Sequence, residues 1–342
     1  MRAVMFRDFG GLPEVVDVSK PDVTATGAVI SVKATGLCRS DWHGWMGHDD
    51  GIRLPHVPGH ELAGVIEAVG SSVSAWRVGD RVTVPFICAC GRCEQCAAGN
   101  HQVCDHQEQP GFTHWGSFAE AVAIAEADVN LIALPDALDF VSAAALGCRF
   151  ATAYRAVMTQ GRVQSGEWVA VHGCGGVGLS AIMIAVAAGA RVVGVDVSPA
   201  SLDLASQLGA QTIPGTGDVA SAVRDLTGGG SHLSLDAYGS RATAVNSIRS
   251  LRKRGRHVQV GLMTGEHASP PIPMDLVVAG ELEILGSHGM AAHEYPEMLA
   301  AIASGRIDPQ LLVGRTISLD EAPAALAAMD GNTHPGMTVI TP

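Results

Sequence analysis

Four cysteines lie close together in this 342-residue chain, in the run CGRCEQCAAGNHQVC at Cys90, Cys93, Cys96 and Cys104. The spacing C-x2-C-x2-C-x7-C brings four thiols together, and zinc binds tetrahedral sets of such ligands. Four cysteinates leave no open position, so the run predicts a structural zinc site. A disulfide or buried-thiol cluster is the alternative. It is disfavoured because the N-terminus, MRAVMFRDFGG, has no apolar signal-peptide core and disulfides rarely persist in the cytosol.

The overall composition is that of a well-packed globular protein. Apolar residues make up 47% of the chain and charged residues 16%, and the length favours two domains. A net charge of −12 argues against a nucleic acid or an anionic membrane as partner. The apolar stretch near residues 181–190 is about half a membrane span, which predicts a buried helix. We therefore expect a cytoplasmic protein that acts on small molecules.

The pattern of apolar residues and glycines changes near Ala143. Residues 1–149 contain short β-branched segments separated by glycine turns, which predicts a mostly antiparallel, barrel-like domain. Residues 150–286 alternate strand-like and helix-like segments, the pattern of a parallel, doubly wound α/β sheet. Residues 287–342 lack this alternation of strand-like and helix-like segments, and we expect them to pack back on the first domain.

The second domain opens with a glycine loop between a strand and a helix. The G-x-G-x-x-G pattern comprises Gly173, Cys174, Gly175, Gly176, Val177 and Gly178. Small residues let the backbone approach a pyrophosphate, and the helix N-terminus supplies amide donors. Asp196 ends the next strand, where a carboxylate accepts from ribose hydroxyls and repels a 2′-phosphate, so NAD is favoured over NADP. The alternative is a glycine turn followed by an unrelated aspartate. We interpret Cys174 as a loop filler and not as a nucleophile.

Three further residues stand out through their surroundings. Cys38 lies in GLCRSDWHGW, His60 in PGHELAG and Cys148 in ALGCRFATAY. A single cysteine or histidine is most often a core residue. Together with the cysteine run and the glycine loop, however, these motifs follow one another in the order that is typical of a known enzyme family. Over essentially its whole length the chain resembles the zinc-containing medium-chain alcohol dehydrogenases, and the yeast and bacterial tetrameric branch most closely.

The resemblance implies a GroES-like catalytic domain followed by a Rossmann-type coenzyme domain. It also implies two zinc ions per subunit, one of them a catalytic zinc held by Cys38, His60 and Cys148 with an open fourth position. Such an enzyme transfers hydride reversibly between an alcohol and NAD, while zinc lowers the pKa of the alcohol and polarises the carbonyl product. The family branch commonly forms a homotetramer (or a homodimer) through the coenzyme domains.

The resemblance assigns roles to four neighbours of the zinc ligands. Glu61 would lie behind the metal as a transient ligand. Asp41 would orient the ligand histidine, although it could be a simple turn cap. Ser40 and then His43 would pass the alcohol's proton outward by way of the nicotinamide ribose, although His43 could be an ordinary surface histidine.

Other positions match residues that contact coenzyme or substrate in the family. Arg39 would bind the pyrophosphate, or else be solvated. The positions matched to the nicotinamide and its carboxamide are Thr152, Val177, Val260 and Leu262. Trp45 and Trp115 would line the substrate pocket, with a place in the hydrophobic core as the alternative.

Two departures from the family pattern remove positive charge near the coenzyme. Ser201 occupies a position that is basic in many relatives, and Met337 follows Gly336 where many have arginine. Both departures weaken the expected preference for NAD over NADP.

Several rival functions remain. A polyol or amino-alcohol dehydrogenase of the same fold often carries glutamate as its third zinc ligand, so Cys148 favours the alcohol branch. A zinc-free quinone reductase would lack the cysteines, and a thiol-based oxidoreductase would be stopped by alkylation and not by chelation. A non-catalytic zinc- or nucleotide-binding module would not need Ser40 and His43.

Overall fold

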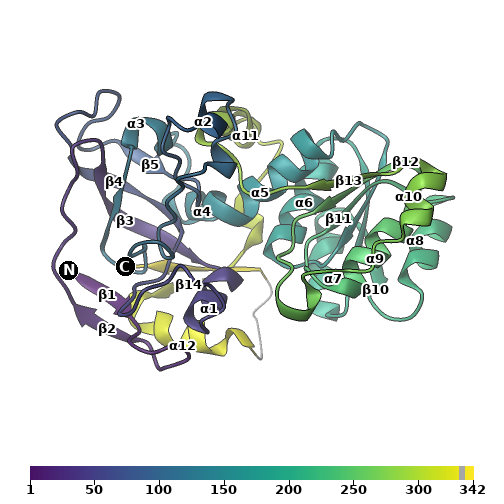
Figure 1. The fold of residues 1–342 in the computed structure, drawn as a ribbon, viewed down its shortest axis with the longest axis horizontal. Helices are drawn as coiled ribbons and strands as arrows, with labels where there is room; N and C mark the ends of the chain where they lie inside the picture. Colours follow the sequence, from purple (N-terminus) through teal and green to yellow (C-terminus); the bar gives the residue numbers. More distant parts are fainter. Residues whose placement is uncertain (331–335) are drawn as a thin grey trace. The chain divides into compact units, whose positions relative to one another are not determined.

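The backbone of the chain divides into two compact units (Figure 1). The structure, a computed structural model, describes residues 1–330 and 336–342. The first unit joins Met1–Ala151 to Gly289–Pro342, and the second is Thr152–His288. These boundaries lie two residues after the expected ones, and the final segment belongs to the first unit.

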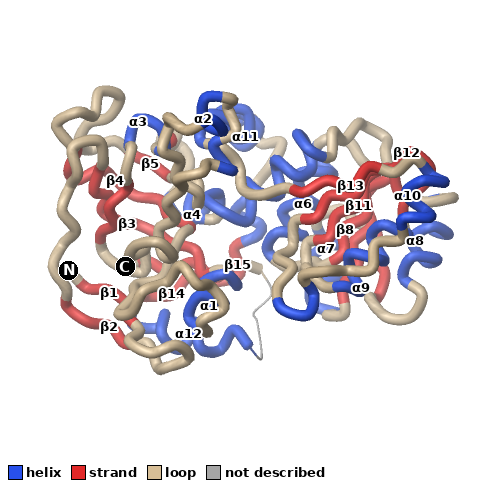
Figure 2. Tube along the Cα trace, in the orientation of Figure 1, coloured by secondary structure: helices blue, strands red, loops and turns tan. Residues whose placement is uncertain are grey.

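The first unit is built on a seven-stranded, mostly antiparallel sheet (Figure 2). Its strands run in the order β14-β15-β3-β4-β5-β7, with β6 beside β3, and β14 pairs with β15 in parallel. A separate antiparallel pair is formed by β1 (Arg2–Met5) and β2 (Glu14–Asp17). The strands of the large sheet are β3 (Ala28–Leu37), β4 (Glu61–Val69), β5 (Arg81–Thr83), β6 (Ala121–Ile124), β7 (Ile132–Ala133), β14 (Val313–Ser318) and β15 (Met337–Thr341).

Strands β3 and β4 bring two distant motifs together. β3 reads AVISVKATGL, in which small and β-branched residues suit a half-buried strand. It pairs antiparallel with β4, with Gly36 opposite Glu61. The end of β3 therefore lies beside the start of β4. Cys38 follows β3 at once and His60 immediately precedes β4, so both residues reach the same end of the sheet.

Short helices surround this sheet. Cys148 lies in η2 (Leu146–Phe150), a π-helical turn, and such turns occur frequently at functional sites. The others are α1 (Arg39–Trp45), α2 (Glu94–Ala97), η1 (His101–Val103), α3 (Ala127–Asn130), α4 (Phe140–Ala144), η5 (Ala292–Glu294), α11 (Tyr295–Ala303), η6 (Pro309–Leu312), η7 (Leu319–Glu321), α12 (Ala322–Ala327) and η8 (Ala328–Asp330).

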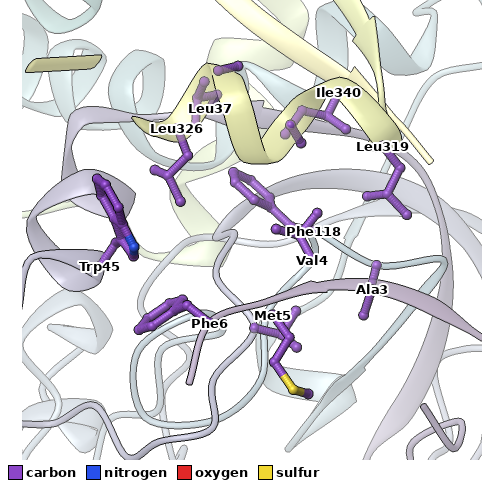
Figure 3. Close-up of a cluster of buried hydrophobic side chains, with 14 of the residues drawn as sticks. Ala3, Val4, Met5, Phe6, Leu37, Trp45, Phe118, Leu319, Leu326 and Ile340 are labelled. Atoms are coloured by element: carbon purple, nitrogen blue, oxygen red, sulfur yellow. The ribbon is translucent and has the colours of Figure 1, made fainter. Parts of the chain in front are cut away.

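One hydrophobic cluster joins the beginning of the chain to its end (Figure 3). Phe6 and Phe118 pack in it with Leu326 of α12 and Ile340 of β15. All four side chains are almost completely buried. Burying side chains of this size contributes about 1.5–3 kcal/mol each, so this cluster ties the C-terminal segment to the first unit.

The second unit is a six-stranded parallel sheet. Its strand order is β10-β9-β8-β11-β12-β13, which in chain order is the 3-2-1-4-5-6 arrangement of the dinucleotide-binding fold. The expected doubly wound domain is thus confirmed. The strands are β8 (Trp168–His172), β9 (Arg191–Asp196), β10 (Gln211–Pro214), β11 (Ser231–Asp236), β12 (Leu251–Gln259) and β13 (Glu283–Gly286).

Helices connect these parallel strands. α6 (Gly176–Ala187) is apolar on all sides, and its residues from Leu179 to Ala185 are buried, as expected for this part of the sequence. In the described residues we find no helix with the length and apolar character that crossing a membrane requires. The remaining helices are α5 (Ala151–Tyr154), η3 (Arg155–Gln160), α7 (Pro199–Gln207), α8 (Val219–Thr227), α9 (Arg241–Arg249), η4 (Gly265–His267) and α10 (Met274–Gly280).

Candidate metal centres and coenzyme-binding loop

The four cysteines of the run converge. The sulfurs of Cys90, Cys93, Cys96 and Cys104 all lie within 4.8 Å of one another. Backbone N–H groups point at them: the amide of Cys90 donates to Cys104 Sγ at 3.3 Å, and that of Cys96 to Cys93 Sγ at 3.4 Å. A backbone hydrogen bond from Arg92 lowers the pKa of Cys90 to about 7. All four are free thiols, so the donor set fits a closed tetrahedral zinc site.

A second group gathers in the first unit from three separate motifs. The ligand atoms of Cys38, His60 and Cys148 lie within 4.8 Å of one another. Cys38 and His60 come from the facing ends of β3 and β4, and Cys148 comes from the π-helical turn. Two sulfurs and one imidazole make the three-ligand set that a catalytic zinc uses, with a fourth position left open.

Asp41 orients the histidine of this group. Its Oδ1 lies 2.9 Å from Nδ1 of His60, and its Oδ2 accepts from the backbone N–H of Cys38 at 2.8 Å. Asp41 therefore also caps the first turn of α1. The two interpretations of this residue, as the partner of His60 and as a turn cap, are compatible. In the neutral ring, with Nδ1 donating, Nε2 of His60 presents a lone pair, and this buried atom has no hydrogen-bond partner in the described protein. An orphaned, completely buried acceptor beside two thiols fits a zinc ion.

The charges within this group are strongly coupled. Hydrogen bonding from Cys148 holds the pKa of Cys38 well below its ordinary value, while the same bond and burial raise that of Cys148. Burial opposes charge on His60, but the Asp41 carboxylate outweighs it and raises the pKa of the imidazole. Without metal, the group therefore keeps protons that zinc must displace.

Glu61 is held by an arginine that the sequence did not single out. The backbone N–H and Nε of Arg149 donate to Glu61 Oε1 at 2.9 and 3.0 Å, and Nη2 donates to Oε2. Both side chains are buried. Burial raises the pKa of Glu61, and the guanidinium opposes this shift. The only signal in the sequence was the place of Arg149 next to Cys148.

Ser40 and His43 lie on the first turns of α1. Ser40 Oγ is 3.8 Å from Cys38 Sγ, close to the candidate metal group. His43 Nδ1 lies 2.9 Å from Nδ1 of His48, a neighbour that the sequence analysis did not name. Burial lowers the pKa of His43, as do the nearby Arg39 and His48. Among the residues that the structure describes, no hydrogen bond joins Ser40 directly to His43.

The two tryptophans have different surroundings. Trp45 packs in the hydrophobic cluster of the first unit (Figure 3) and is 7% exposed. Its Nε1 donates to the Gly11 carbonyl at 2.6 Å. Its apolar neighbours and satisfied N–H are those of a core residue, which is the alternative interpretation, and its place in the wall of the substrate pocket stays a prediction. Trp115 is 38% exposed and donates to the Pro55 carbonyl. The Arg39 guanidinium stacks 3.9 Å from the Trp42 ring.

In the second unit, the glycine loop joins β8 to α6 with little room for side chains. Gly173 has φ of 95°, in the left-handed region. A Cβ on Gly178 would lie 1.8 Å from the Gly173 carbonyl oxygen, so the helix and the loop require glycine there. A Cβ on Gly175, at the N-cap of α6, would meet nothing within 4 Å. This open cradle in front of a helix N-terminus fits a coenzyme pyrophosphate.

Asp196 stands at the carboxyl end of β9, beside this loop. Its Oδ2 accepts from the Cys174 N–H at 2.7 Å and its Oδ1 from the Ser198 N–H at 2.8 Å, which fixes the carboxylate. Burial, and then Asp196, raise the pKa of Cys174 to about 12. Cys174 is almost completely buried in the loop, which is consistent with a packing role. Ser201 lies at the start of α7, where its N–H donates to Ser198 Oγ.

A second carboxylate at this edge was missed by the sequence analysis. Asp236 ends β11, is completely buried and accepts from the backbone N–H groups of Tyr238 and Gly239 at 3.0 Å. Its own carbonyl accepts from the amides of Val260 and Gly261.

The remaining expected coenzyme residues all belong to the second unit. Oγ1 of Thr152 is buried without a hydrogen-bond partner, which leaves it available to a ligand. Val177 is half-buried on the first turn of α6, and Leu262 is 54% exposed.

Known proteins of similar sequence and structure share this architecture. Residues 24–136 match the alcohol dehydrogenase GroES-like domain, and residues 176–304 match the zinc-binding dehydrogenase domain. An alcohol dehydrogenase of Geobacillus stearothermophilus is 36% identical over 313 residues, 90% of each chain. The alcohol dehydrogenase TADH of Thermus sp. ATN1 superimposes with a TM-score of 0.92 at 32% identity, over 100% of this chain and 99% of that one. An NAD-dependent alcohol dehydrogenase gives 0.90 at 31% identity, with full coverage of both chains.

Proposed function

This chain belongs to the zinc-dependent medium-chain alcohol dehydrogenase family, and we propose that it converts an alcohol to an aldehyde or ketone, reversibly, with NAD as the hydride acceptor. One observation carries the proposal. Cys38, His60 and Cys148 converge from three motifs, and the buried Nε2 of His60 has no partner in the protein. Its orientation is set by the hydrogen bond from Nδ1 to Asp41.

These three residues would hold the catalytic zinc. When bound, zinc supplies a Lewis acid that lowers the pKa of an alcohol and polarises a carbonyl. Asp41 keeps His60 in the tautomer that presents Nε2. Arg149 holds both carboxylate oxygens of Glu61, which argues that Glu61 tunes the charge behind the ligands and does not itself bind the metal in this state.

Ser40 is proposed as the first acceptor of the substrate's proton. Its hydroxyl lies beside Cys38, on α1, whose N-cap residue is Cys38. His43 is proposed to release the proton to water, because it is half-buried and its lowered pKa keeps the ring neutral and able to accept.

NAD is the proposed coenzyme of the second unit. The Gly175 cradle would take its pyrophosphate. A role for Arg39 in pyrophosphate binding rests on the family resemblance. Asp196 would accept from the ribose hydroxyls. Thr152, Val177, Val260 and Leu262 are proposed to contact the nicotinamide end. The Asp196→Gly variant should narrow the preference for NAD over NADP, which we expect to be about 1–3 kcal/mol. Comparable kcat/KM values for the two coenzymes in the unchanged chain would contradict this assignment.

Metal analysis and substrate screening test the proposed activity. Chain purified without chelators should contain two zinc ions and reduce NAD in the presence of an alcohol from a panel of primary, secondary, benzylic and polyol substrates. Cys38→Ala should abolish turnover and remove one zinc while the fold survives. Cys93→Ala should instead lower stability, because a structural zinc contributes to folding. One zinc or none per chain, or turnover that resists orthophenanthroline, would overturn the proposal.

The geometry favours the alcohol branch over its rivals. The third member of the metal group is the thiol of Cys148, whereas polyol and amino-alcohol relatives often use glutamate there. The panel separates these substrate classes directly.

We also propose that the chain works in the cytoplasm as a homotetramer (or a homodimer). This is supported by the apolar side chains exposed on α10 and β13, among them Met274, Leu276, Val278 and Ile284. A sedimentation mass near that of one chain would contradict it.

A further inference from the structure

The second unit carries a concentration of positive charge that the proposed reaction does not use. A cavity of about 420 Å³ is lined by Arg162, Glu167, His232, Arg252, Lys253, Arg254, Arg256 and Glu283. Five cationic side chains thus face two carboxylates in a chain whose net charge is −12. Since the rest of the chain is acidic, this local excess of positive charge is a candidate binding site for an anion.

The cavity lies at the opposite edge of the sheet from the coenzyme loop. Its lining residues stand at or near the beginnings of β8, β11, β12 and β13, whereas Asp196 and Asp236 stand at strand ends. All these strands are parallel (Figure 1). β11 alone, with six residues, separates the two edges by roughly 17 Å. The cavity is therefore a place distinct from the coenzyme site.

A bulge in β12 places three of the cations side by side. Ser231 of β11 pairs with Leu251 of β12, and Leu233 pairs with Arg256. Two steps along β11 thus correspond to five along β12, and the extra residues include the run Arg252-Lys253-Arg254. Arg254 has φ of 62°, in the left-handed region that a non-glycine residue rarely occupies. Bulges of this kind re-aim side chains that a regular strand would place on alternate faces.

Two of the cations lack a carboxylate partner. Arg256 pairs with Glu167 at 2.6 Å, Arg162 with Glu283, and Arg254 with Glu281. Among the residues that the structure describes, no ion pair forms at Arg252 or Lys253, and both side chains are exposed on the cavity.

The contact of Arg252 with His232 leaves donors without an acceptor. The Trp168 N–H donates to His232 Nδ1 at 3.0 Å, so a neutral ring carries its proton on Nε2. Burial and then the Arg252 guanidinium lower the pKa of His232, which keeps the ring neutral. Arg252 Nη1 lies 2.8 Å from that same Nε2. Two N–H donors thus lie next to each other without an acceptor, and an anion that lies beside both nitrogens would accept from both.

We propose that this bulge is a binding site for a small phosphate-type anion, either the free ion or a phosphate monoester. Arg252 and Lys253 supply the charge, the Nε2–H of His232 supplies a neutral donor, and the paired Arg162 and Arg256 complete the rim. Arginine presents its donors in a fork that matches phosphate oxygens, and charge-assisted bonds of this kind are the strong ones. The site is independent of the proposed dehydrogenase activity.

Calorimetric titration at constant ionic strength tests the site. The probes are inorganic phosphate and glycerol 3-phosphate, with saturating NAD present so that the coenzyme loop is filled. We expect one site per chain. Arg252→Gln combined with Lys253→Gln should weaken binding at least tenfold. The matched control, Arg249→Gln with Arg306→Gln, removes two exposed cations outside the cavity and should change affinity less than twofold.

The relative affinities of the two probes identify the ligand. Tighter binding of glycerol 3-phosphate than of phosphate would identify an ester as the ligand, and the reverse order would identify the free ion. Equal weakening in the cavity and control variants would overturn the proposal, because it would mean diffuse attraction. An absence of binding would overturn it as well. Lys253→Gln alone serves if the double variant fails to fold, since that exposed side chain has no recorded partner in the described structure, and it should still weaken binding several-fold.

Discussion

Arg149 and Glu61 form an ion pair that is buried on both sides, directly behind the candidate metal ligands. Arg149 touches Glu61 through its side chain and through its backbone, and it follows Cys148 in the chain. Because neither charge reaches water, each depends on the other. The pair therefore fixes the turn that carries Cys148 relative to the strand that begins at Glu61.

Removing one partner of this pair should be costly. We expect Arg149→Met to destabilise the chain by about 3–5 kcal/mol, because it leaves a buried carboxylate without a counter-charge. Lys20→Met is the control, since it breaks an exposed pair with Glu67 and should cost about 1 kcal/mol or less. Urea unfolding of the zinc-loaded variants measures both. Equal losses in the free energy of unfolding for the two variants would show that the charges of the Arg149–Glu61 pair are as well solvated as those of an exposed pair.

The proposed proton route makes a prediction at two neighbouring residues. Ser40→Ala should lower kcat by about 10²- to 10⁴-fold, the usual contribution of a general acid–base group. His43→Ala should cost less, and chiefly at low pH, because water can replace a distal imidazole. Ser72→Ala, an exposed serine of the same unit, should have no effect. The measurement is kcat against pH with a deuterated alcohol, to confirm that hydride transfer limits the rate. Near-normal turnover of Ser40→Ala would mean that the proton leaves by another path.

At the scale of elements, the glycine loop offers a clean separation of folding from binding. A Cβ at position 178 would collide with the carbonyl of Gly173, whereas one at position 175 would enter open space. Gly178→Ala should therefore lower the melting temperature. Gly175→Ala should leave it unchanged and raise the KM for NAD, because the methyl group occupies the cradle. Thermal unfolding and steady-state kinetics of the two variants suffice. A stability loss at position 175 would refute the cradle.

The elements also show what the sequence could and could not reveal. The four-cysteine run, the G-x-G-x-x-G loop and the residues around Cys38, His60 and Cys148 are local patterns, and each led to the right element. Arg149, Asp236 and the β12 bulge depend on which side chains become buried and how strands register. Neither property is visible in a single local pattern. The sequence left two interpretations of Trp45 open for the same reason, because a tryptophan in a core and a tryptophan in a pocket wall give the same local pattern.

At the scale of the whole molecule, burial of histidines links stability to pH. His172 and His257 are almost completely buried in the second unit. Burial, together with His257 nearby, lowers the pKa of His172 to about 3, and burial lowers that of His257 to about 4. The unfolded chain takes up these protons near pH 6.5, so the folded state loses stability as the pH falls below that value and is unaffected above it.

This linkage should be measurable in variants. Between pH 7 and 5 each of the two histidines should account for a loss of about 2 kcal/mol. His257→Gln should be less stable than the unchanged chain at pH 7, and the difference should shrink by about that amount at pH 5. His293→Gln, an exposed histidine, should show no such change. Urea unfolding at both values gives the differences, in which any common loss of metal cancels. A difference that stays constant with pH would contradict the linkage.

The pairing of β15 with β3 has a consequence for how the protein is made. β3 leads to Cys38, and its neighbour β15 follows the whole second unit in the sequence. During synthesis the second unit emerges whole and is free to fold while the first unit still lacks β14, β15 and α12. The sheet beside Cys38 is completed only after β14 and β15 have been synthesised, so the second unit can fold before the first unit closes around a metal.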